Sequence, residues 1–346
     1  MKLLMSDKED SLNDMLAMLR RFTQPRATQS EPRQEPEPES VPPKPVVRVV
    51  AHSDGAANIG AARKLLARIN AATGFRSSSA LERKLAQVLR NSSEADIDAL
   101  LRQPAEVVSA ELSTIVEDLT NHETFFFRDV MQLDPLLEEF LPELIKQRAK
   151  QDKKLRIWSA ACATGEEVYT LAIIALQALA AAGHASFNSH DGFRLRDDWR
   201  LEVLGTDISR QAVRVSRAGA YQESGFGSFR QMPAGSQQYF TQTSSGVGRY
   251  GEQARYLSVL PSISRHVRFD TFNLISRNPP LLDCDLVLCR NVLIYIDIER
   301  HADIYDMIFR SLRTGGIFVP SLVDQVSHTG FKTRWSNRCA FYEKRK

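Results

Sequence analysis

The chain has 346 residues, of which 43% are hydrophobic and 25% charged, a composition typical of globular proteins with room for two domains and a remainder. Its 45 basic and 42 acidic residues leave a net charge of +3, which excludes the dense positive field of a non-specific nucleic-acid binder. The longest apolar stretch, residues 171–183, is shorter than the roughly 20 residues that span a bilayer, so we expect no direct membrane insertion.

The N-terminus and the cysteines indicate a cytoplasmic protein. The first ten residues turn acidic before an apolar run can form, which argues against a secretory signal. The four cysteines form no C-x-x-C pair and have no histidine spacing typical of zinc, so we expect buried thiols and no metal site. They are Cys162, Cys284, Cys289 and Cys339.

Residues 1–60 are predicted to be a disordered tail. Seven of the 15 prolines fall in residues 25–45 among Gln, Glu and Ser, a pattern that indicates an extended linker. Ahead of it, apolar residues recur at helical spacing and predict a short amphipathic helix, which either docks a partner or has no function. They are Leu12, Met15, Leu16, Leu19 and Phe22.

Residues 61–130 are predicted to form a helical N-terminal domain. Apolar residues recur at i, i+3 and i+4 in several separate stretches, which indicates three or four short helices in a small bundle. Their apolar faces are Leu81, Leu85, Val88 and Leu89, then Ile97, Leu100 and Leu101, then Leu112, Ile115, Val116 and Leu119.

From residue 131 to 346, short apolar runs alternate with helical stretches, the signature of an α/β fold. Most of the runs are continuously apolar, as expected of parallel strands covered on both faces. They are residues 155–160, 201–206, 267–270, 285–290 and 317–320, and residues 340–343 would add an antiparallel edge strand. Between about 222 and 266 the pattern lapses into Gly, Ser and Gln, which predicts a small β insertion with candidate strands at 249–250 and 255–259.

The first strand is followed by the small-residue turn Ala161–Glu167, which leads into a helix. Small side chains let a ligand approach the backbone, and a helix start offers unpaired N–H groups. The turn has one glycine instead of G-x-G-x-x-G, and Glu166 and Glu167 stand where a pyrophosphate would need positive surroundings. A dinucleotide is therefore disfavoured, and the two glutamates could equally serve only to complement the helix dipole.

Asp207 ends the second strand. A carboxylate there can accept both hydroxyls of a ribose, or it can cap the helix that begins near Ser209. It lies 42 positions after Gly165, against the roughly 20 expected of a nicotinamide dinucleotide site. The two turns together favour an adenosine-like ligand that carries its own positive charge, and S-adenosylmethionine meets that description.

Two further segments carry candidate site residues. Asn291 follows the fourth strand and can either pair with a ligand or end the strand in a turn, while Arg290 and Tyr295 could border a reaction site. Upstream, three phenylalanines precede Arg128, and an arginine beside so much apolar surface usually has an anionic partner.

Three stretches in the same order resemble the motifs of the chemotaxis receptor methyltransferases of the CheR type: TNHETFFFR at 120–128, RIWSAACATGEE at 156–167 and CRNVLIY at 289–295. The resemblance covers roughly residues 74–346. It implies a class I methyltransferase fold, a Rossmann-like and mostly parallel sheet with a small β insertion, preceded by a small all-α helical domain. The implied activity is methyl transfer from S-adenosylmethionine to glutamate side chains of methyl-accepting chemotaxis receptors, which sets receptor adaptation and leaves S-adenosylhomocysteine.

The resemblance also implies roles for individual residues. Thr124 and Arg128 would bind the methionine end of the cofactor, Glu166 would contact it from the first turn, and Asp207 would hold the ribose. The implied cofactor-binding set is His122, Thr124, Arg128, Glu166, Asp207, Asn273, Leu274, Asn291 and Val292, and the implied catalytic residues are Arg128 and Tyr295. The implied partners are the cytoplasmic domains of the receptors, with a receptor tail peptide bound at the β insertion in some members.

Three departures from the family pattern leave alternatives open. His122 stands where many members carry an asparagine, Val168 replaces a proline, and residues 320–324 read Pro-Ser-Leu-Val-Asp where the family has Gly-His-Ser-Glu. One alternative is a methyltransferase of the same fold that acts on another substrate. The other is a catalytically inactive adaptor that binds S-adenosylmethionine.

Overall fold

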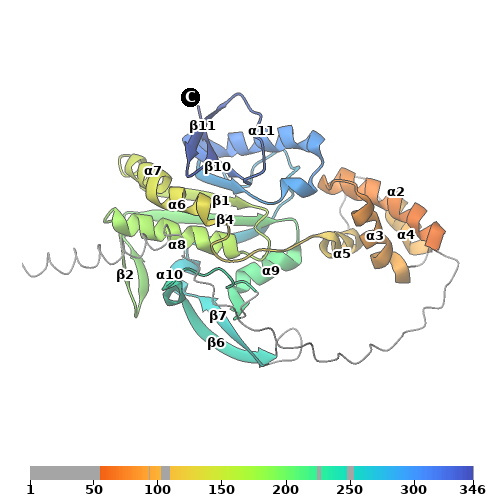
Figure 1. The fold of residues 1–346 in the computed structure, drawn as a ribbon, viewed down its shortest axis with the longest axis horizontal. Helices are drawn as coiled ribbons and strands as arrows, with labels where there is room; N and C mark the ends of the chain where they lie inside the picture. Colours follow the sequence, from red (N-terminus) through yellow and green to blue (C-terminus); the bar gives the residue numbers. More distant parts are fainter. Residues whose placement is uncertain (1–54, 93, 103–109, 224–226, 248–252, 346) are drawn as a thin grey trace, which may run out of the picture.

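The computed structural model describes residues 55–92, 94–102, 110–223, 227–247 and 253–345 (Figure 1). The predicted N-terminal amphipathic segment, the proline-rich linker and the candidate strand at 249–250 lie outside these residues. The described chain opens with helices α2 (Gly55–Thr73), α3 (Ser79–Val88), α4 (Glu94–Arg102) and α5 (Ala110–Leu119), with a 3-10 turn η1 (Leu89–Asn91).

These four helices form the predicted all-α region. The Ser78 side chain caps α3 by accepting the Leu81 N–H, as expected of serine at a helix start. Leu65, Leu85 and Leu112 are fully buried between the helices, so the apolar stripes face one another as their spacing predicts. Whether residues 61–130 fold as a separate domain stays a prediction.

The rest of the chain is built on one seven-stranded sheet with the strand order β11-β12-β10-β9-β1-β4-β8. Strands β10, β9, β1, β4 and β8 are parallel, and β12 and β11 add an antiparallel edge. The strands are β1 (Lys154–Ala160), β4 (Arg200–Asp207), β8 (Val267–Thr271), β9 (Cys284–Cys289), β10 (Leu312–Pro320), β11 (Phe331–Ser336) and β12 (Cys339–Lys344). The predicted mostly parallel α/β sheet is therefore confirmed.

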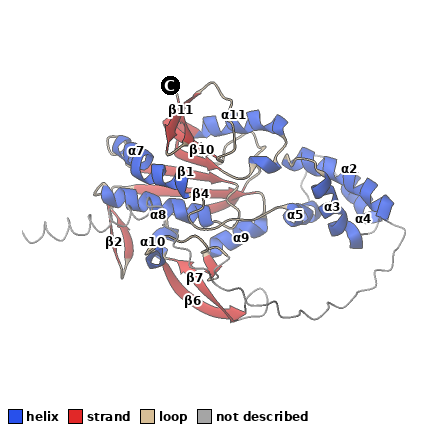
Figure 2. Cartoon of the chain, viewed as in Figure 1, coloured by secondary structure: helices blue, strands red, loops and turns tan. Residues whose placement is uncertain are grey.

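Helices cover both faces of this sheet (Figure 2). They are α6 (Val130–Pro135), η2 (Leu136–Phe140), α7 (Leu141–Arg148), α8 (Glu166–Ala181), α9 (Arg210–Ala218), α10 (Pro261–Ser264) and α11 (His301–Ser311), with short turns η3 (Ser236–Tyr239), η4 (Leu293–Tyr295) and η5 (Ile298–Arg300). Alternation along β1 sends Ile157 into the core beneath α8 and Trp158 into the core shared with α11 and the N-terminal helices. Each fully buried side chain of this size contributes about 1.5–3 kcal/mol.

Two small antiparallel sheets lie outside the main sheet. The predicted β insertion is confirmed as β5 (Ala220–Gln222), β6 (Phe240–Val247) and β7 (Gln253–Val259), in the order β5-β7-β6. A hairpin of β2 (Ala185–Asn188) and β3 (Gly192–Leu195) was not predicted. It packs Phe187 and Phe193 against Tyr239, at ring-centre distances of 5.6 and 5.7 Å.

The helical region sits beyond the ends of the central strands (Figure 1). The contacts that join it to the sheet region include three hydrogen bonds to backbone carbonyls: Asn273 Nδ2 donates to the Ala72 carbonyl at 2.7 Å, Asp297 N to the Gly74 carbonyl at 2.8 Å, and Arg76 N to the Tyr295 carbonyl at 2.8 Å. Among the helices of the described ranges, none is long and apolar enough to cross a membrane.

Candidate active site

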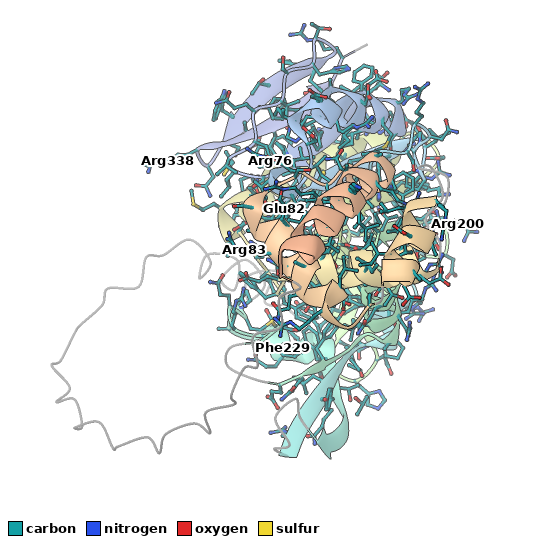
Figure 3. All side chains as sticks on the ribbon, turned by 90° about the vertical axis from the view of Figure 1, so that its right-hand side faces the viewer. Arg76, Glu82, Arg83, Arg200, Phe229 and Arg338 are labelled. Carbon is teal, nitrogen blue, oxygen red and sulfur yellow. The ribbon has the colours of Figure 1, made fainter. Side chains whose placement is uncertain are left out.

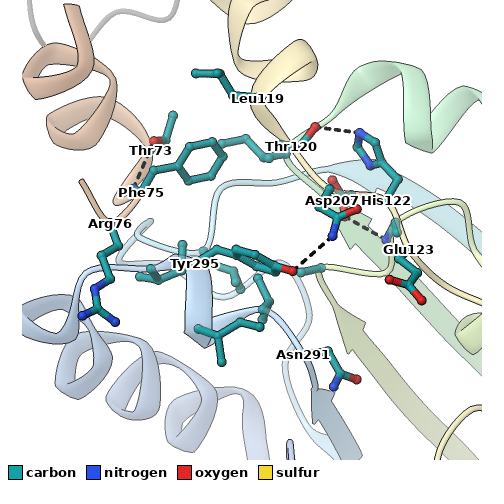
Figure 4. Close-up of a pocket in the computed structure, with 18 of the residues that line it drawn as sticks. Thr73, Phe75, Arg76, Leu119, Thr120, His122, Glu123, Asp207, Asn291 and Tyr295 are labelled. Atoms are coloured by element: carbon teal, nitrogen blue, oxygen red, sulfur yellow. Dashed lines mark hydrogen bonds between the residues drawn. The ribbon is translucent and has the colours of Figure 1, made fainter. Parts of the chain in front are cut away.

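A pocket of about 510 Å³ lies between the helical region and the carboxyl ends of the central strands (Figure 4). This is where an open α/β sheet usually holds its ligand. The predicted site residues that line it are His122, Thr124, Arg128, Asp207, Asn273, Leu274, Asn291, Val292 and Tyr295. Predicted residues from four separate segments of the chain are thus brought together.

The turn after β1 has a strained backbone that enters the pocket. Ala161 and Ala163 adopt φ of 61° and 48°, in the left-handed region that costs a non-glycine residue about 1–2 kcal/mol. Gly165, at φ 95°, begins α8, and a Cβ there would lie 2.8 Å from the Ser216 side chain. Because strain of this kind collects at ligand sites, the turn supports the prediction that a ligand approaches the backbone here.

Asp207 lies at the end of β4 with 7% of its surface exposed. Its Oδ2 accepts the Ala163 N–H at 2.8 Å and its Oδ1 accepts the Ser209 N–H at 2.9 Å. Burial raises the pKa of Asp207, and backbone hydrogen bonds from Ser209, Ala163 and Ile208 and the nearby His122 oppose that rise. The carboxylate also lines the pocket, where ligand hydroxyls can reach its oxygens.

His122 is held beside Asp207 by the end of α5 (Figure 4). Thr120 Oγ1 donates to the Glu117 carbonyl at 2.7 Å and lies 2.6 Å from His122 Nε2. Since a hydroxyl has only one proton to donate, His122 Nε2 must be the donor in the second bond.

Arg128 lines the pocket, and some of its guanidinium donors make no hydrogen bond to the part of the chain that the structure describes. Its Nη1 donates to the Glu123 carbonyl at 2.8 Å, and its Nε lies 4.0 Å from Asp129 Oδ2, the limit of an ion pair. The guanidinium also lies 5.6 Å from the centre of the Phe125 ring. An anionic ligand group could therefore bind the remaining donors, which suits a carboxylate.

Glu166 and Glu167 point to different places. Glu166 is 2% exposed and does not line the pocket, because its carboxylate accepts the hydroxyls of Thr164 and Ser228 at 2.7 Å each. Glu167 lines the pocket wall instead. Because the Glu166 side chain is buried outside the pocket, the structure does not bring it together with the other predicted residues.

The role of Arg290 as an anchor was not predicted. Its side chain is 2% exposed, and Nε donates to Glu167 Oε2 at 2.7 Å. Its other nitrogens donate to Gln132 Oε1 at 3.2 Å and to the Arg128 carbonyl at 3.1 Å. The residue lines the pocket, at the border of the site as the sequence pattern indicated, and it also ties β9, α8, α6 and the Arg128 loop together.

Three further predicted residues, Asn273, Asn291 and Tyr295, also line the pocket. Asn273 uses its amide to hold the Ala72 carbonyl and the Ile275 N–H, so it joins the two regions as well as facing the pocket. Asn291 adopts φ 56° at the end of β9. Tyr295 is 45% exposed, and its hydroxyl accepts from Asn121 Nδ2 at 3.2 Å. Tyr295 is therefore placed where an incoming macromolecule can reach it.

These residues fit a ligand with a nucleoside at one end and a charged amino-acid arm at the other. Asp207 offers carboxylate oxygens for a diol, the turn after β1 places backbone beside the pocket, and Arg128 offers donors for a carboxylate. Within the described ranges, no three His, Cys, Asp or Glu side chains gather as metal ligands would.

The chain matches a known protein family and several of its members. Residues 122–331 match the family model described as CheR methyltransferase, SAM binding domain. The chain is 33% identical over 202 residues to Chemotaxis protein methyltransferase 1 of Pseudomonas aeruginosa, covering 58% of this chain and 65% of that protein. It is 30% identical over 202 residues to the probable chemotaxis protein methyltransferase of Rhizobium etli, covering 58% of this chain and 67% of that protein.

Among solved structures, the chain is similar to a TehB-like SAM-dependent methyltransferase from Corynebacterium glutamicum. The identity is 13% and the TM-score 0.31, over 59% of this chain and 87% of that one. A likeness at this level carries no argument about function.

Proposed function

The chain belongs to the CheR methyltransferase family, and we propose that it transfers a methyl group from S-adenosylmethionine to glutamate side chains of methyl-accepting chemotaxis receptors. It would work in the cytoplasm, on the cytoplasmic domains of the receptors, and thereby set receptor adaptation. S-adenosylhomocysteine would be the second product.

One observation supports this function above the others: Asp207 and Arg128 line the same pocket, and one offers acceptors while the other offers donors to a ligand. Asp207 presents carboxylate oxygens, which accept hydrogen bonds, and Arg128 presents guanidinium donors that make no other hydrogen bond among the described residues. The first suits a ribose diol and the second the carboxylate of a methionine arm. His122, Thr124, Asn273, Leu274, Asn291 and Val292 complete the proposed cofactor-binding wall.

The proposed reaction needs no general base, because the acceptor glutamate is already ionised near neutral pH. S-adenosylmethionine supplies a methyl group on a positively charged sulfur. The tasks left to the chain are to hold the acceptor oxygen in line with that methyl at about 3 Å and to exclude water from the carboxylate. Arg128 and Tyr295 lie on the pocket wall, and we assign them this positioning.

Other surfaces support binding of a macromolecular acceptor. Figure 3 looks onto the helical region, where Arg76 and Arg83 lie on the surface, and Arg76 also lines the pocket. We propose residues 61–130 as a separate domain that helps to seat the receptor beside the site. In the β insertion, β6 is an edge strand, to which a receptor tail peptide could add as a further strand.

The test is to incubate the chain with radiolabelled S-adenosylmethionine and a panel of receptor cytoplasmic fragments, then to treat the product with mild base. We expect label on a receptor fragment that base releases as methanol, as a carboxyl methyl ester requires. Base-stable label would point to another acceptor group. Binding of S-adenosylhomocysteine without any labelling would favour a catalytically inactive adaptor.

A further inference from the structure

A carboxylate of the helical region, that of Glu117, contacts the first turn of helix α9 in the sheet region. Glu117, near the end of α5, lies with both Oε1 and Oε2 3.2 Å from the Gln211 nitrogen and accepts the Ser209 hydroxyl at 3.2 Å. Gln211 is in the first turn of α9, where backbone N–H groups have no partner within the helix. A side chain from α5 thus satisfies a group that α9 cannot satisfy itself.

Ser209 connects this contact to Asp207. It is fully buried, its N–H donates to Asp207 Oδ1 at 2.9 Å, and its hydroxyl oxygen accepts the Ala212 N–H at 3.0 Å. Because the hydroxyl proton goes to Glu117, the rotation of Ser209 is set by bonds on both sides. A shift of Glu117 would therefore move the N–H that orients the Asp207 carboxylate.

The end of α5 reaches Asp207 by a second path. Thr120 donates to the Glu117 carbonyl and accepts from His122, which lies beside Asp207. Lys84 of α3 secures the same helix end by donating to the carbonyls of Leu119 and Thr120 at 3.2 and 3.4 Å. The helical region therefore contacts the surroundings of Asp207 twice, through Ser209, which bonds to Asp207, and through His122, which lies beside it.

We propose that Glu117 is a positioning residue for cofactor binding, which acts through Ser209 to hold the Asp207 carboxylate in the orientation that accepts the ribose hydroxyls. The proposal rests on the proposed function, because it assumes that Asp207 binds a ribose. It makes the docking of the helical region a condition of tight cofactor binding. The helical region would then contribute to the site as well as to partner recognition.

The test is a double-mutant cycle on binding of S-adenosylhomocysteine, measured by calorimetry with the full chain. We expect Glu117→Ala to weaken binding about tenfold and Glu117→Gln, which keeps an acceptor for the Gln211 N–H, to weaken it about threefold or less. In an Asp207→Asn background, Glu117→Ala should add less than about a twofold further loss. Asp118→Asn, an exposed carboxylate on the same helix, is the matched control and should leave affinity unchanged.

A second readout needs no ligand. In the free protein, the Ser209 and Gln211 amides should exchange with deuterium faster in Glu117→Ala than in Asp118→Asn. If the alanine variant does not fold, the same exchange rates are measured in Glu117→Gln. Equal losses from Glu117→Ala in the wild-type and Asp207→Asn backgrounds would overturn the proposal, as would unchanged affinity in both Glu117 variants. If the wild-type chain does not bind S-adenosylhomocysteine, the proposed function itself fails, which is a separate result.

Discussion

Arg290 donates from its Nε to Oε2 of Glu167 at 2.7 Å, and their side chains are 2% and 13% exposed. The other Glu167 oxygen accepts the Ser159 hydroxyl at 2.7 Å. The pair therefore joins the ends of β1 and β9 to the start of α8 at the pocket wall. Removing one partner would leave the other charge buried with no counter-charge.

We predict that Arg290→Ala lowers the free energy of unfolding by about 3–5 kcal/mol, because it leaves the buried Glu167 carboxylate without its counter-charge. The matched control is Arg255→Ala, whose partner Glu223 lies 3.3 Å away in a pair that is 60% and 41% exposed. That change should cost less than about 1 kcal/mol. Urea denaturation of both variants measures the difference, and equal costs would contradict the assigned role of Arg290.

Asp207→Asn should weaken binding of S-adenosylhomocysteine by about 10- to 100-fold at pH 7.5, since hydrogen bonds to a charged acceptor contribute about 1.5–3 kcal/mol. Burial raises the pKa of Asp207 above its ordinary value of 3.8, so the wild-type carboxylate takes up its proton at a higher pH than an exposed aspartate. Wild-type affinity should therefore fall as the pH is lowered through that raised pKa. A variant whose affinity fell in parallel with the wild type would place the titrating group elsewhere.

Tyr295→Phe should lower the rate of methyl transfer by about tenfold, the effect of losing one hydrogen bond, and change S-adenosylhomocysteine affinity by less than about twofold. The reason is that the Tyr295 hydroxyl lies at the exposed mouth of the pocket, bonded only to Asn121 among the described residues. Tyr342→Phe, on β12 outside the pocket, should leave the rate unchanged. Steady-state kinetics on a receptor fragment separates these outcomes.

Asp134→Asn should stabilise the fold at neutral pH. Burial, with the nearby Glu138 charge, raises the pKa of Asp134 from 3.8 to about 6. Since the folded-state pKa is the higher one, the stability that this group contributes is full below pH 3.8 and lost as the pH rises through about 6.

For a half-exposed group we expect a gain of about 1 kcal/mol at pH 7.5 after allowing for solvent screening, and no gain near pH 4. Thermal unfolding at both pH values measures it, with Asp118→Asn as an exposed control. A gain of equal size at the two pH values would show that the effect is not due to the Asp134 charge.

The central strands could be predicted from the sequence because burial on both faces makes them continuous apolar runs, as in Leu286–Cys289 of β9. The hairpin β2-β3 and the edge strand β11 could not, because they are short or half exposed, and β11 carries Lys332 and Arg334 among its residues. Such strands depend on pairing with neighbours that no local pattern reveals.

The site was predictable where a residue follows a strand, as with Asp207 and Asn291, since the carboxyl ends of parallel strands converge. It was not predictable where helix orientation decides. Glu166 and Glu167 are neighbours in sequence, but the left-handed Gly165 sets the start of α8 so that one is turned to Ser228 and the other to the pocket. The contact of Glu117 with α9 could not be predicted from the sequence, because only tertiary packing brings α5 to α9.

The central claim is that this pocket methylates glutamate side chains, and the most direct measurement is the site of the methyl group. A receptor cytoplasmic fragment would be incubated with the chain and S-adenosylmethionine, digested, and sequenced by tandem mass spectrometry, beside a parallel reaction with the Arg128→Ala variant. The account predicts methyl groups on glutamate side chains with the wild-type chain and few or none with the variant. Methyl groups on another residue type, or equal modification by the variant, would contradict it.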